Sequence, residues 1–329
     1  ETHYTSNWGK LELRQAISDN LMRLYNVKYD PTSEVIATVG VSEALYLTFT
    51  ALLDPGDEVI IPAPYWLSYP EMVRLAGAEP VIVQTTEQGG WKMTAEQFEN
   101  AMTPKTKMII INSPGNPTGS VYTKEELRAI SEVAAEEEIF ILSDEIYERL
   151  TYQGTEHVSI ASLTPETHDL SITVNGFSKA YAMTGWRLGY LGAPEAIAKA
   201  IDSMQSHSTS NPCSFAQKGG LAALKGDQQC VADMRDEFDI RREYMFDRLS
   251  NIAGVSAVKP LGAFYVLVNI GTYGLKSQNF ADRLLSKANV AVVPGIAFGD
   301  DRTIRLSYAT SLDVIKKGLD RLEEFCKTL

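Results

Sequence analysis

Cysteine is scarce in this chain of 329 residues, which contains three, and histidine occurs only four times. Cys213, Cys230 and Cys326 are widely spaced and form no Cys-x-x-Cys pair, and no histidine beside them completes a metal-ligand set. The sequence therefore predicts neither a disulfide framework nor a metal site. We interpret the cysteines as reduced thiols, which indicates a cytoplasmic protein.

Long apolar runs are also missing, and the longest, such as residues 108–111 and 139–142, have the length of strands. They fall well short of the roughly 20 residues that span a bilayer, and no signal-peptide pattern is present. Basic residues are outnumbered, because 30 Lys and Arg face 42 Asp and Glu, with a formal charge of −12 and a pI near 4.9. This balance argues against a nucleic-acid partner, although a local cationic pocket remains compatible with it.

The composition that is present, 44% hydrophobic and 22% charged, is typical of a soluble globular protein. The length allows a large core and two domains, and we find no internal repeat or low-complexity linker. The sequence begins with Glu1 rather than Met, and Tyr4 and Trp8 resemble the middle of an element. We therefore expect an N-terminal segment to precede this numbering.

Helical and strand patterns alternate through the first part of the chain. Leu13, Ile17 and Leu21 repeat at helical spacing and predict a helix over residues 10–25. Apolar strand patterns at 35–39, 58–62, 80–83, 107–112, 139–143 and 172–174 are separated by helical patterns, among them 66–76. This order predicts an α/β fold with a mostly parallel sheet between helices, and ligands in such folds bind beyond the carboxyl ends of the strands.

Near residue 254 the pattern changes to shorter elements. Residues 262–268, 290–293 and 303–307 are strand-like, and 280–288 and 312–329 are helical. We predict a large domain over residues 1–233 and a smaller α+β domain over 234–329.

One stretch combines several signals of a binding site. Lys179 follows the strand at 172–174 in a segment of small residues, and Arg187 comes shortly afterwards. A neighbouring cation and partial burial both lower the pKa of a lysine. A Schiff-base lysine needs such a lowered pKa, because it reacts as the neutral amine. Other strand ends carry Gly40-Val41-Ser42 at a helix start, which suits a phosphate, Asn116-Pro117-Thr118-Gly119, and Asp144 with Tyr147.

The order Gly176-Phe177-Ser178-Lys179 followed by Arg187-Leu188-Gly189 resembles the pyridoxal 5′-phosphate attachment signature of class I aminotransferases of fold type I. The resemblance extends to the segments Asn116 to Gly119, Ser143 to Tyr147, Gly262 to Tyr265 and Arg305 to Tyr308, and covers essentially the whole chain. It is strongest to bacterial aspartate and aromatic aminotransferases. It implies ping-pong transfer of an amino group from an α-amino acid, such as aspartate, glutamate or an aromatic amino acid, to a 2-oxo acid.

The resemblance also implies the residue roles. Lys179 is expected to form the Schiff base with pyridoxal 5′-phosphate and to move the proton, while Asp144 pairs with the ring nitrogen and Tyr147 with the phenolic oxygen. Arg305 and Asn116 are expected to bind the substrate. Asn116 is also expected to contact the phenolic oxygen of the cofactor. The remaining implied cofactor contacts are Gly40, Val41, Ser42, Trp66, Ser178, Arg187 and, across a homodimer interface, Tyr4 in the neighbouring site.

Two departures from the family pattern stand out. The Gly-x-Pro-Asp-Phe segment that closes over substrate has no counterpart in this numbering. Some aspartate-specific relatives also have Gly-Lys where this chain has Val41-Ser42, so an aromatic or other uncharged substrate side chain becomes an alternative.

Two other functions remain open at this point. A carbon–sulfur β-lyase can use the same cofactor and scaffold. An aminotransferase-like ligand-sensing domain of a transcription regulator is the second, although the acidic chain and the complete set of catalytic residues argue against it.

Overall fold

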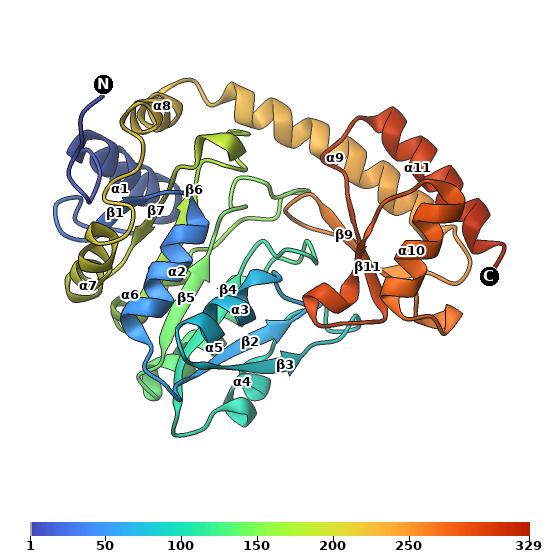
Figure 1. Cartoon of the computed structure of the whole chain (residues 1–329), viewed down its shortest axis with the longest axis horizontal. Coiled ribbons are helices and arrows are strands. Elements are labelled where there is room, and N and C mark those ends of the chain that lie inside the picture. Colours follow the sequence, from blue (N-terminus) through green and yellow to red (C-terminus); the bar gives the residue numbers. More distant parts are fainter. Residues whose placement is uncertain (1) are drawn as a thin grey trace.

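Two bodies joined by one long helix make up the computed structural model, which describes residues 2–329 (Figure 1). The helices are α1 (Leu11–Tyr25), α2 (Val41–Leu52), α3 (Ser68–Leu75), α4 (Ala95–Ala101), α5 (Lys124–Glu136), α6 (Pro165–Leu170), α7 (Glu195–Ser206), α8 (Ser214–Lys225), α9 (Gln229–Ser250), α10 (Ser277–Ala288) and α11 (Leu312–Cys326). The strands are β1 (Val35–Thr38), β2 (Glu58–Ala63), β3 (Glu79–Gln84), β4 (Thr106–Asn112), β5 (Phe140–Asp144), β6 (Ser171–Gly176), β7 (Gly189–Gly192), β8 (Ser256–Ala257), β9 (Tyr265–Asn269), β10 (Val293–Pro294) and β11 (Thr303–Ser307).

The larger body is built on a seven-stranded sheet in the order β1-β7-β6-β5-β4-β2-β3. Neighbouring strands from β6 to β3 run parallel, and β7 is antiparallel to both β6 and β1. The predicted α/β fold with a mostly parallel sheet is confirmed. Because the parallel strands end at one edge, the loops after β4, β5 and β6 meet there.

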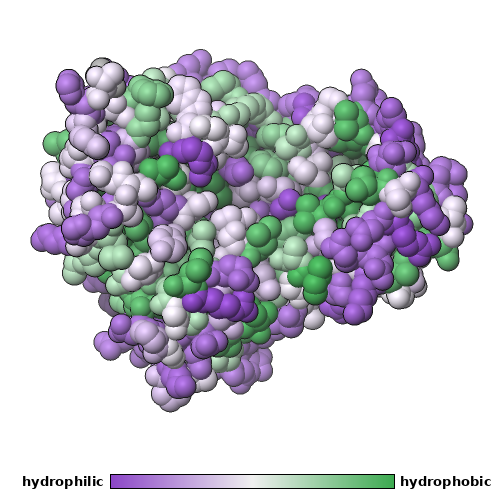
Figure 2. All heavy atoms as spheres, in the orientation of Figure 1, coloured by the Kyte–Doolittle hydropathy of each residue, from purple (hydrophilic) through white to green (hydrophobic). Residues whose placement is uncertain are grey.

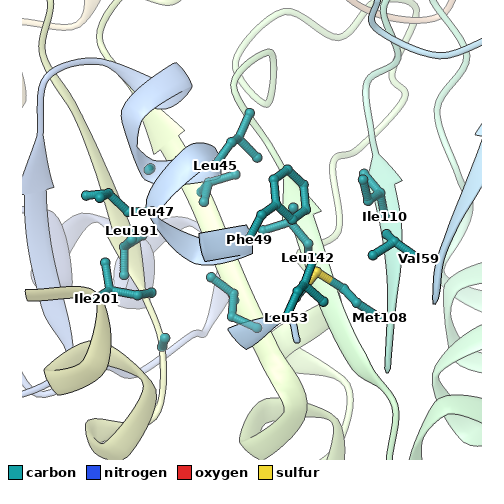
Figure 3. Close-up of a cluster of buried hydrophobic side chains, with 14 of the residues drawn as sticks. Leu45, Leu47, Phe49, Leu53, Val59, Met108, Ile110, Leu142, Leu191 and Ile201 are labelled. Atoms are coloured by element: carbon teal, nitrogen blue, oxygen red, sulfur yellow. The ribbon is translucent and has the colours of Figure 1, made fainter. Parts of the chain in front are cut away.

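Both faces of this sheet are buried, as the near-continuous apolar strands require. On one face, side chains of α2 and α7 pack on alternate residues of the strands, such as Ile110 and Leu142 (Figure 3). On the other face, α4 and α5 cover the intervening residues, such as Ile109 and Ile141. The two packed layers fix the strand ends that carry the site.

Local sequence signals set the starts of two helices on the second face. Thr94 caps α4 and Thr123 caps α5, each in a capping box with a partner at the third helical position. In each box the threonine hydroxyl and the partner side chain satisfy one backbone N–H apiece. The spacing of Thr94 to Gln97 and of Thr123 to Glu126 in the sequence accounts for both boxes.

The smaller body has an antiparallel sheet in the order β10-β11-β9-β8, with α9, α10 and α11 packed on it. The strand predicted over residues 290–293 is wrong in most of its length. Only Val293 and Pro294 pair with β11, at Arg305 and Ile304, so β10 is a short edge strand. The helix predicted over 312–329 ends at Cys326.

Helix α9 runs through the predicted domain boundary between residues 233 and 234 and enters the smaller body (Figure 1). The separate sheets and cores agree with two domains, whereas the place of the boundary stays a prediction. None of the helices in the described part of the chain is long and apolar enough to cross a membrane.

Candidate active site

A cavity of about 320 Å³ lies where the ends of β4, β5 and β6 face β9 and β11 of the second sheet. Figure 2 shows the surface hollowed between the two bodies, with hydrophobic residues along this hollow. Most of the predicted site residues line the cavity: Val41, Ser42, Trp66, Asn116, Asp144, Tyr147, Ser178, Lys179, Arg187 and Arg305. The fold therefore brings together residues that lie far apart in the sequence.

Lys179 lies in the loop after β6, as the sequence predicted, and its side chain is partly buried between two aromatic rings. Its Nζ atom is 5.7 Å from the ring centroid of Tyr147 and 5.6 Å from that of Phe264. Burial lowers the pKa of Lys179. The positive charges of Arg187 and Arg305 lower this pKa further, whereas the negative charge of Asp144 raises it. The site thus makes the amine easier to deprotonate than that of a solvent-exposed lysine.

Asp144 is the last residue of β5 and is almost fully buried. The Tyr69 hydroxyl donates to Oδ2 at 2.6 Å, and the Ile146 N–H donates to Oδ1 at 3.2 Å. Burial raises the pKa of Asp144 to about 6, although both hydrogen bonds and Lys179 favour the ionised form. A cation placed beside this carboxylate would favour ionisation further.

Arg187 approaches the start of α2 so closely that only glycine fits at Gly40. A Cβ atom at Gly40 would lie 2.4 Å from Arg187 Nη2, and the positive φ of 76° also favours glycine there. The first backbone N–H groups of a helix lack partners within the helix. The guanidinium and the amides of Val41 and Ser42 thus face one place, which suits a doubly charged anion such as a phosphate.

Arg305 extends from β11 across the cavity to the larger body. Its Nη1 donates to Asn116 Oδ1 at 2.8 Å, and the guanidinium lies 4.4 Å from the ring centroid of Tyr265 and 4.9 Å from that of Phe298. Its Nε is buried and has no hydrogen-bond partner among the described residues. A guanidinium that lies close to two aromatic rings and still has a donor to offer suits a carboxylate ligand.

Two functional tyrosines were missed by sequence reasoning. Tyr69, on α3, is the hydrogen-bond donor to Asp144, and Tyr265, on β9, shares a hydrogen bond of 3.0 Å with the hydroxyl of Tyr147. Burial is the main reason why the pKa of Tyr147 lies well above its ordinary range, and the electrostatic effect of Tyr265 raises this pKa further. The motif Gly262 to Tyr265 was a signal for Tyr265, whereas Tyr69 lies in the predicted helix over residues 66–76 without a signal of its own.

Two predicted cofactor contacts, Gly40 and Tyr4, are not part of the cavity wall. Gly40 lies beside Arg187, whereas Tyr4 has no such contact with a described residue of the wall. Its side chain is 89% exposed, and the neighbouring Thr5 N–H donates to Asn211 near the start of α8. The prediction that Tyr4 acts in a neighbouring subunit stays a prediction.

Thiol and metal chemistry have no structural support in the described part of the chain. The three cysteines are free, with Cys213 and Cys230 exposed and Cys326 buried. Residues 2–329 contain no group of His, Cys, Asp or Glu side chains that could hold a metal ion. The ionisable groups in the cavity wall are the amine of Lys179, the carboxylate of Asp144, tyrosine phenols and two guanidinium groups.

Comparison with known proteins shows one family. The model of aminotransferase class I and II matches residues 1–322. An aspartate aminotransferase of Bacillus sp. (strain YM-2) is 47% identical over 99% of this chain and 84% of its own length. A probable aspartate/prephenate aminotransferase of Aquifex aeolicus is 44% identical over 98% and 83%. The crystal structure of an aromatic aminotransferase from Pyrococcus horikoshii superimposes with a TM-score of 0.97 at 40% identity, covering 99% of this chain and 88% of that one.

Proposed function

The chain belongs to the class I and II aminotransferases and is an enzyme of amino-group transfer, and we propose that it works with pyridoxal 5′-phosphate bound in the cavity at Lys179. The observation that supports this proposal most directly is the partly buried amine of Lys179 between the Asp144 carboxylate and the cations Arg187 and Arg305. The substrates of such an enzyme are an α-amino acid and a 2-oxo acid.

The residues present fit the cofactor. Its phosphate would be held by Arg187 and the amides of Val41 and Ser42 at the start of α2, where a Cβ atom on Gly40 would collide with the guanidinium. Ser178 lines the same part of the cavity. Trp66 also lines the cavity, where its ring is available to stack on the cofactor.

The bound cofactor supplies an aldehyde that condenses with amines and a ring that withdraws electrons from the substrate α-carbon. Asp144 would accept a hydrogen bond from the ring nitrogen, and a cationic nitrogen there would keep the carboxylate ionised. Tyr147 and Asn116 would donate to the phenolic oxygen. Lys179 would hold the cofactor through Nζ and, once the substrate amine has displaced it, carry a proton from the α-carbon.

Arg305 would bind the substrate α-carboxylate. Its unpartnered, buried Nε is a donor that a carboxylate would satisfy, and the bond to Asn116 fixes the orientation of the guanidinium. A bidentate guanidinium–carboxylate contact adds geometric selection to charge attraction. It would present the substrate amine toward Lys179.

The wall of the cavity favours a substrate with an uncharged side chain. Among the described residues, only Lys179, Arg187 and Arg305 bring positive charge to it. Each of these cations already has a role, so none remains for a carboxylate on the substrate side chain, and Ser42 adds no charge. We therefore rank aromatic donors ahead of aspartate and glutamate, in line with the relative named for aromatic substrates.

We also propose a homodimer in which Tyr4 reaches the neighbouring subunit's phosphate site. Three aromatic side chains are exposed around α8: Tyr4 at 89%, Phe215 at 66% and Trp186 at 47%. Trp186 lies against Gly219 of that helix. Exposed aromatic groups of this kind are typical of interfaces. Analytical ultracentrifugation should give a dimer, and a fully active monomer would contradict this proposal.

The test of function is to add single amino acids to the protein purified with pyridoxal 5′-phosphate and to record the cofactor absorption spectrum. We expect the amino form of the cofactor to accumulate stoichiometrically, with no release of ammonia, and phenylalanine or tyrosine to act faster than aspartate. Steady release of ammonia would instead support lyase chemistry.

Lys179→Ala should abolish turnover, because no other amine lines the cavity in the described residues. Lys199→Ala is the matched control, since Lys199 is exposed on α7 and pairs only with Glu195. Substantial transamination by the Lys179 variant would overturn the assignment.

A further inference from the structure

A buried polar cluster lies behind the cavity, and the proposed mechanism does not use it. The turn after β5 points Asp144 and Tyr147 into the cavity, whereas Glu145 and Glu148 are absent from the cavity wall. Glu145 and Glu148 are nevertheless 1% and 7% exposed. Two carboxylates buried next to the proposed cofactor contacts need a structural reason, because burying charge is costly unless it is paired.

Glu145 has such partners. Its Oε1 accepts hydrogen bonds from Ser143 Oγ at 2.9 Å and Ser159 Oγ at 2.7 Å. Its Oε2 lies 3.1 Å from His157 Nε2, and both side chains of this pair are 1% exposed. Since a carboxylate with these partners is an acceptor, His157 Nε2 carries the proton that it shares with Glu145. The pair ties the loop before residue 160 to the turn of Asp144.

The contacts on the other side of His157 restrict its ring further. Tyr25 of α1 packs edge-on against the imidazole, with 5.0 Å between ring centroids. Glu148 is the second carboxylate, and burial raises its pKa to about 7, opposed by His157, Arg149 and the nearby Asn175 amide. Among the described residues, His157 Nδ1 and Glu148 Oε2 are both buried without a hydrogen-bond partner, so the imidazole is held by its contact with Glu145.

We propose that Glu145 and His157 are positioning residues whose buried pair fixes the turn carrying Asp144 and Tyr147, and thereby sets the affinity for the cofactor. This inference rests on the proposed function. The pair lies next to the residue that it would position, because Asp144 directly precedes Glu145. The backbone of the turn is also held by hydrogen bonds: Glu145 N donates to Val174 O at 2.9 Å, and Leu150 N donates to Tyr147 O at 2.8 Å. Without the side-chain pair, the turn would keep these backbone bonds but lose the contact that sets its orientation. Displacements of about 1 Å are enough to weaken a preorganised site.

The experiment compares His157→Phe with His157→Gln. Phenylalanine keeps a planar ring but removes the donor, while the glutamine amide replaces Nε2 and cannot titrate. We expect His157→Phe to weaken pyridoxal 5′-phosphate binding to the cofactor-free protein by roughly tenfold, as expected for the loss of one hydrogen bond to a charged group. We expect His157→Gln to stay within about twofold of the unchanged protein. In the same series kcat should fall with His157→Phe while KM for the amino donor stays unchanged, because Arg305 is untouched.

His168→Phe is the matched control. His168 also contacts a tyrosine ring and a carboxylate, at Tyr29 and Asp169, but lies outside the cavity wall and outside this cluster. It should leave cofactor affinity unchanged. Glu145→Gln provides a second variant if His157→Phe does not fold, and it should weaken binding in the same way.

Urea unfolding of the cofactor-free variants separates positioning from general stability. If His157→Phe or Glu145→Gln lowers stability but binds the cofactor as tightly as the unchanged protein, the positioning role is refuted. If the unchanged protein itself does not bind pyridoxal 5′-phosphate, the proposed function fails instead.

Discussion

Asp144→Asn should stabilise the cofactor-free protein while it removes most of the activity. Burial raises the pKa of Asp144 from 3.8 to about 6, and each pKa unit corresponds to 1.36 kcal/mol. Keeping this carboxylate ionised in the folded protein at pH 8 therefore costs about 3 kcal/mol. Asparagine has the same shape and carries no charge. Its Oδ1 can accept from the Ile146 N–H, and its amide N–H can donate to the hydroxyl oxygen of Tyr69.

Proton linkage gives the direction in which the free energy of unfolding changes with pH. Because the folded protein raises this carboxyl pKa, the stability associated with Asp144 is fully present below about pH 3.8 and is lost as the pH rises through about 6. The advantage of Asp144→Asn should thus be about 3 kcal/mol at pH 8 and roughly half of that at pH 5. Equilibrium urea unfolding of both cofactor-free proteins at one protein concentration measures the difference.

Two results would contradict the reasoning. If the difference in the free energy of unfolding between the two proteins is the same at pH 5 and pH 8, Asp144 does not titrate in this range. If the variant is less stable than the unchanged protein at pH 8, the charge of Asp144 is favourable in the cofactor-free protein. With cofactor present, kcat should fall by roughly 10² to 10³, the usual effect of removing one preorganised electrostatic group.

Three further substitutions test other parts of the structure. Arg305→Lys cannot keep both a forked contact to a carboxylate and the bond to Asn116, so steady-state kinetics should show KM for the amino donor raised roughly 10- to 100-fold, and an unchanged KM would refute the carboxylate role. Gly189→Ala would place a Cβ atom 2.6 Å from the backbone at the start of α2, so a fluorescence titration should show weaker cofactor binding. Gly318→Ala, where nothing lies within 4 Å of the added atom, is its control and should bind normally. Phe49→Ala empties a fully buried position in the core of the larger body (Figure 3) and should lower the free energy of unfolding by about 3 to 5 kcal/mol; a loss below about 1 kcal/mol would show that the core refills.

Features that depend on local chemistry could be predicted from the sequence. The capping boxes at Thr94 and Thr123 involve residues within one turn, so their pattern determines their structure. The place of Lys179 after a strand follows from the β-branched run before it. Since parallel strands end at a common edge, the cavity residues at those ends could also be grouped in advance.

Features that depend on tertiary packing could not be predicted. Tyr69 donates to Asp144 from a helix 75 positions earlier in the chain, and its apolar neighbours fit a core residue equally well. The direction of β7, antiparallel in a mostly parallel sheet, leaves no trace in hydrophobic periodicity. Val290 to Val292 are β-formers by composition, but the register of β10 pairs only Val293 and Pro294 with β11.

The charge distribution would allow an acidic protein to bind the proposed anionic ligands. The whole chain carries −12, yet the cavity wall gathers Lys179, Arg187 and Arg305 around one buried carboxylate, Asp144. Burial, and after it the charges of Arg187 and Arg305, lower the pKa of Lys179. A phosphate at Arg187 and a carboxylate at Arg305 would each remove part of the contribution of the two arginines. Binding of substrate would therefore make Nζ more basic at the stage when it has to accept a proton from the α-carbon. Arg187 and Arg305 would thus bind the anions, and this binding would prepare Lys179 for proton transfer. The local arrangement of these cations therefore matters more for the proposed chemistry than the net charge of the chain.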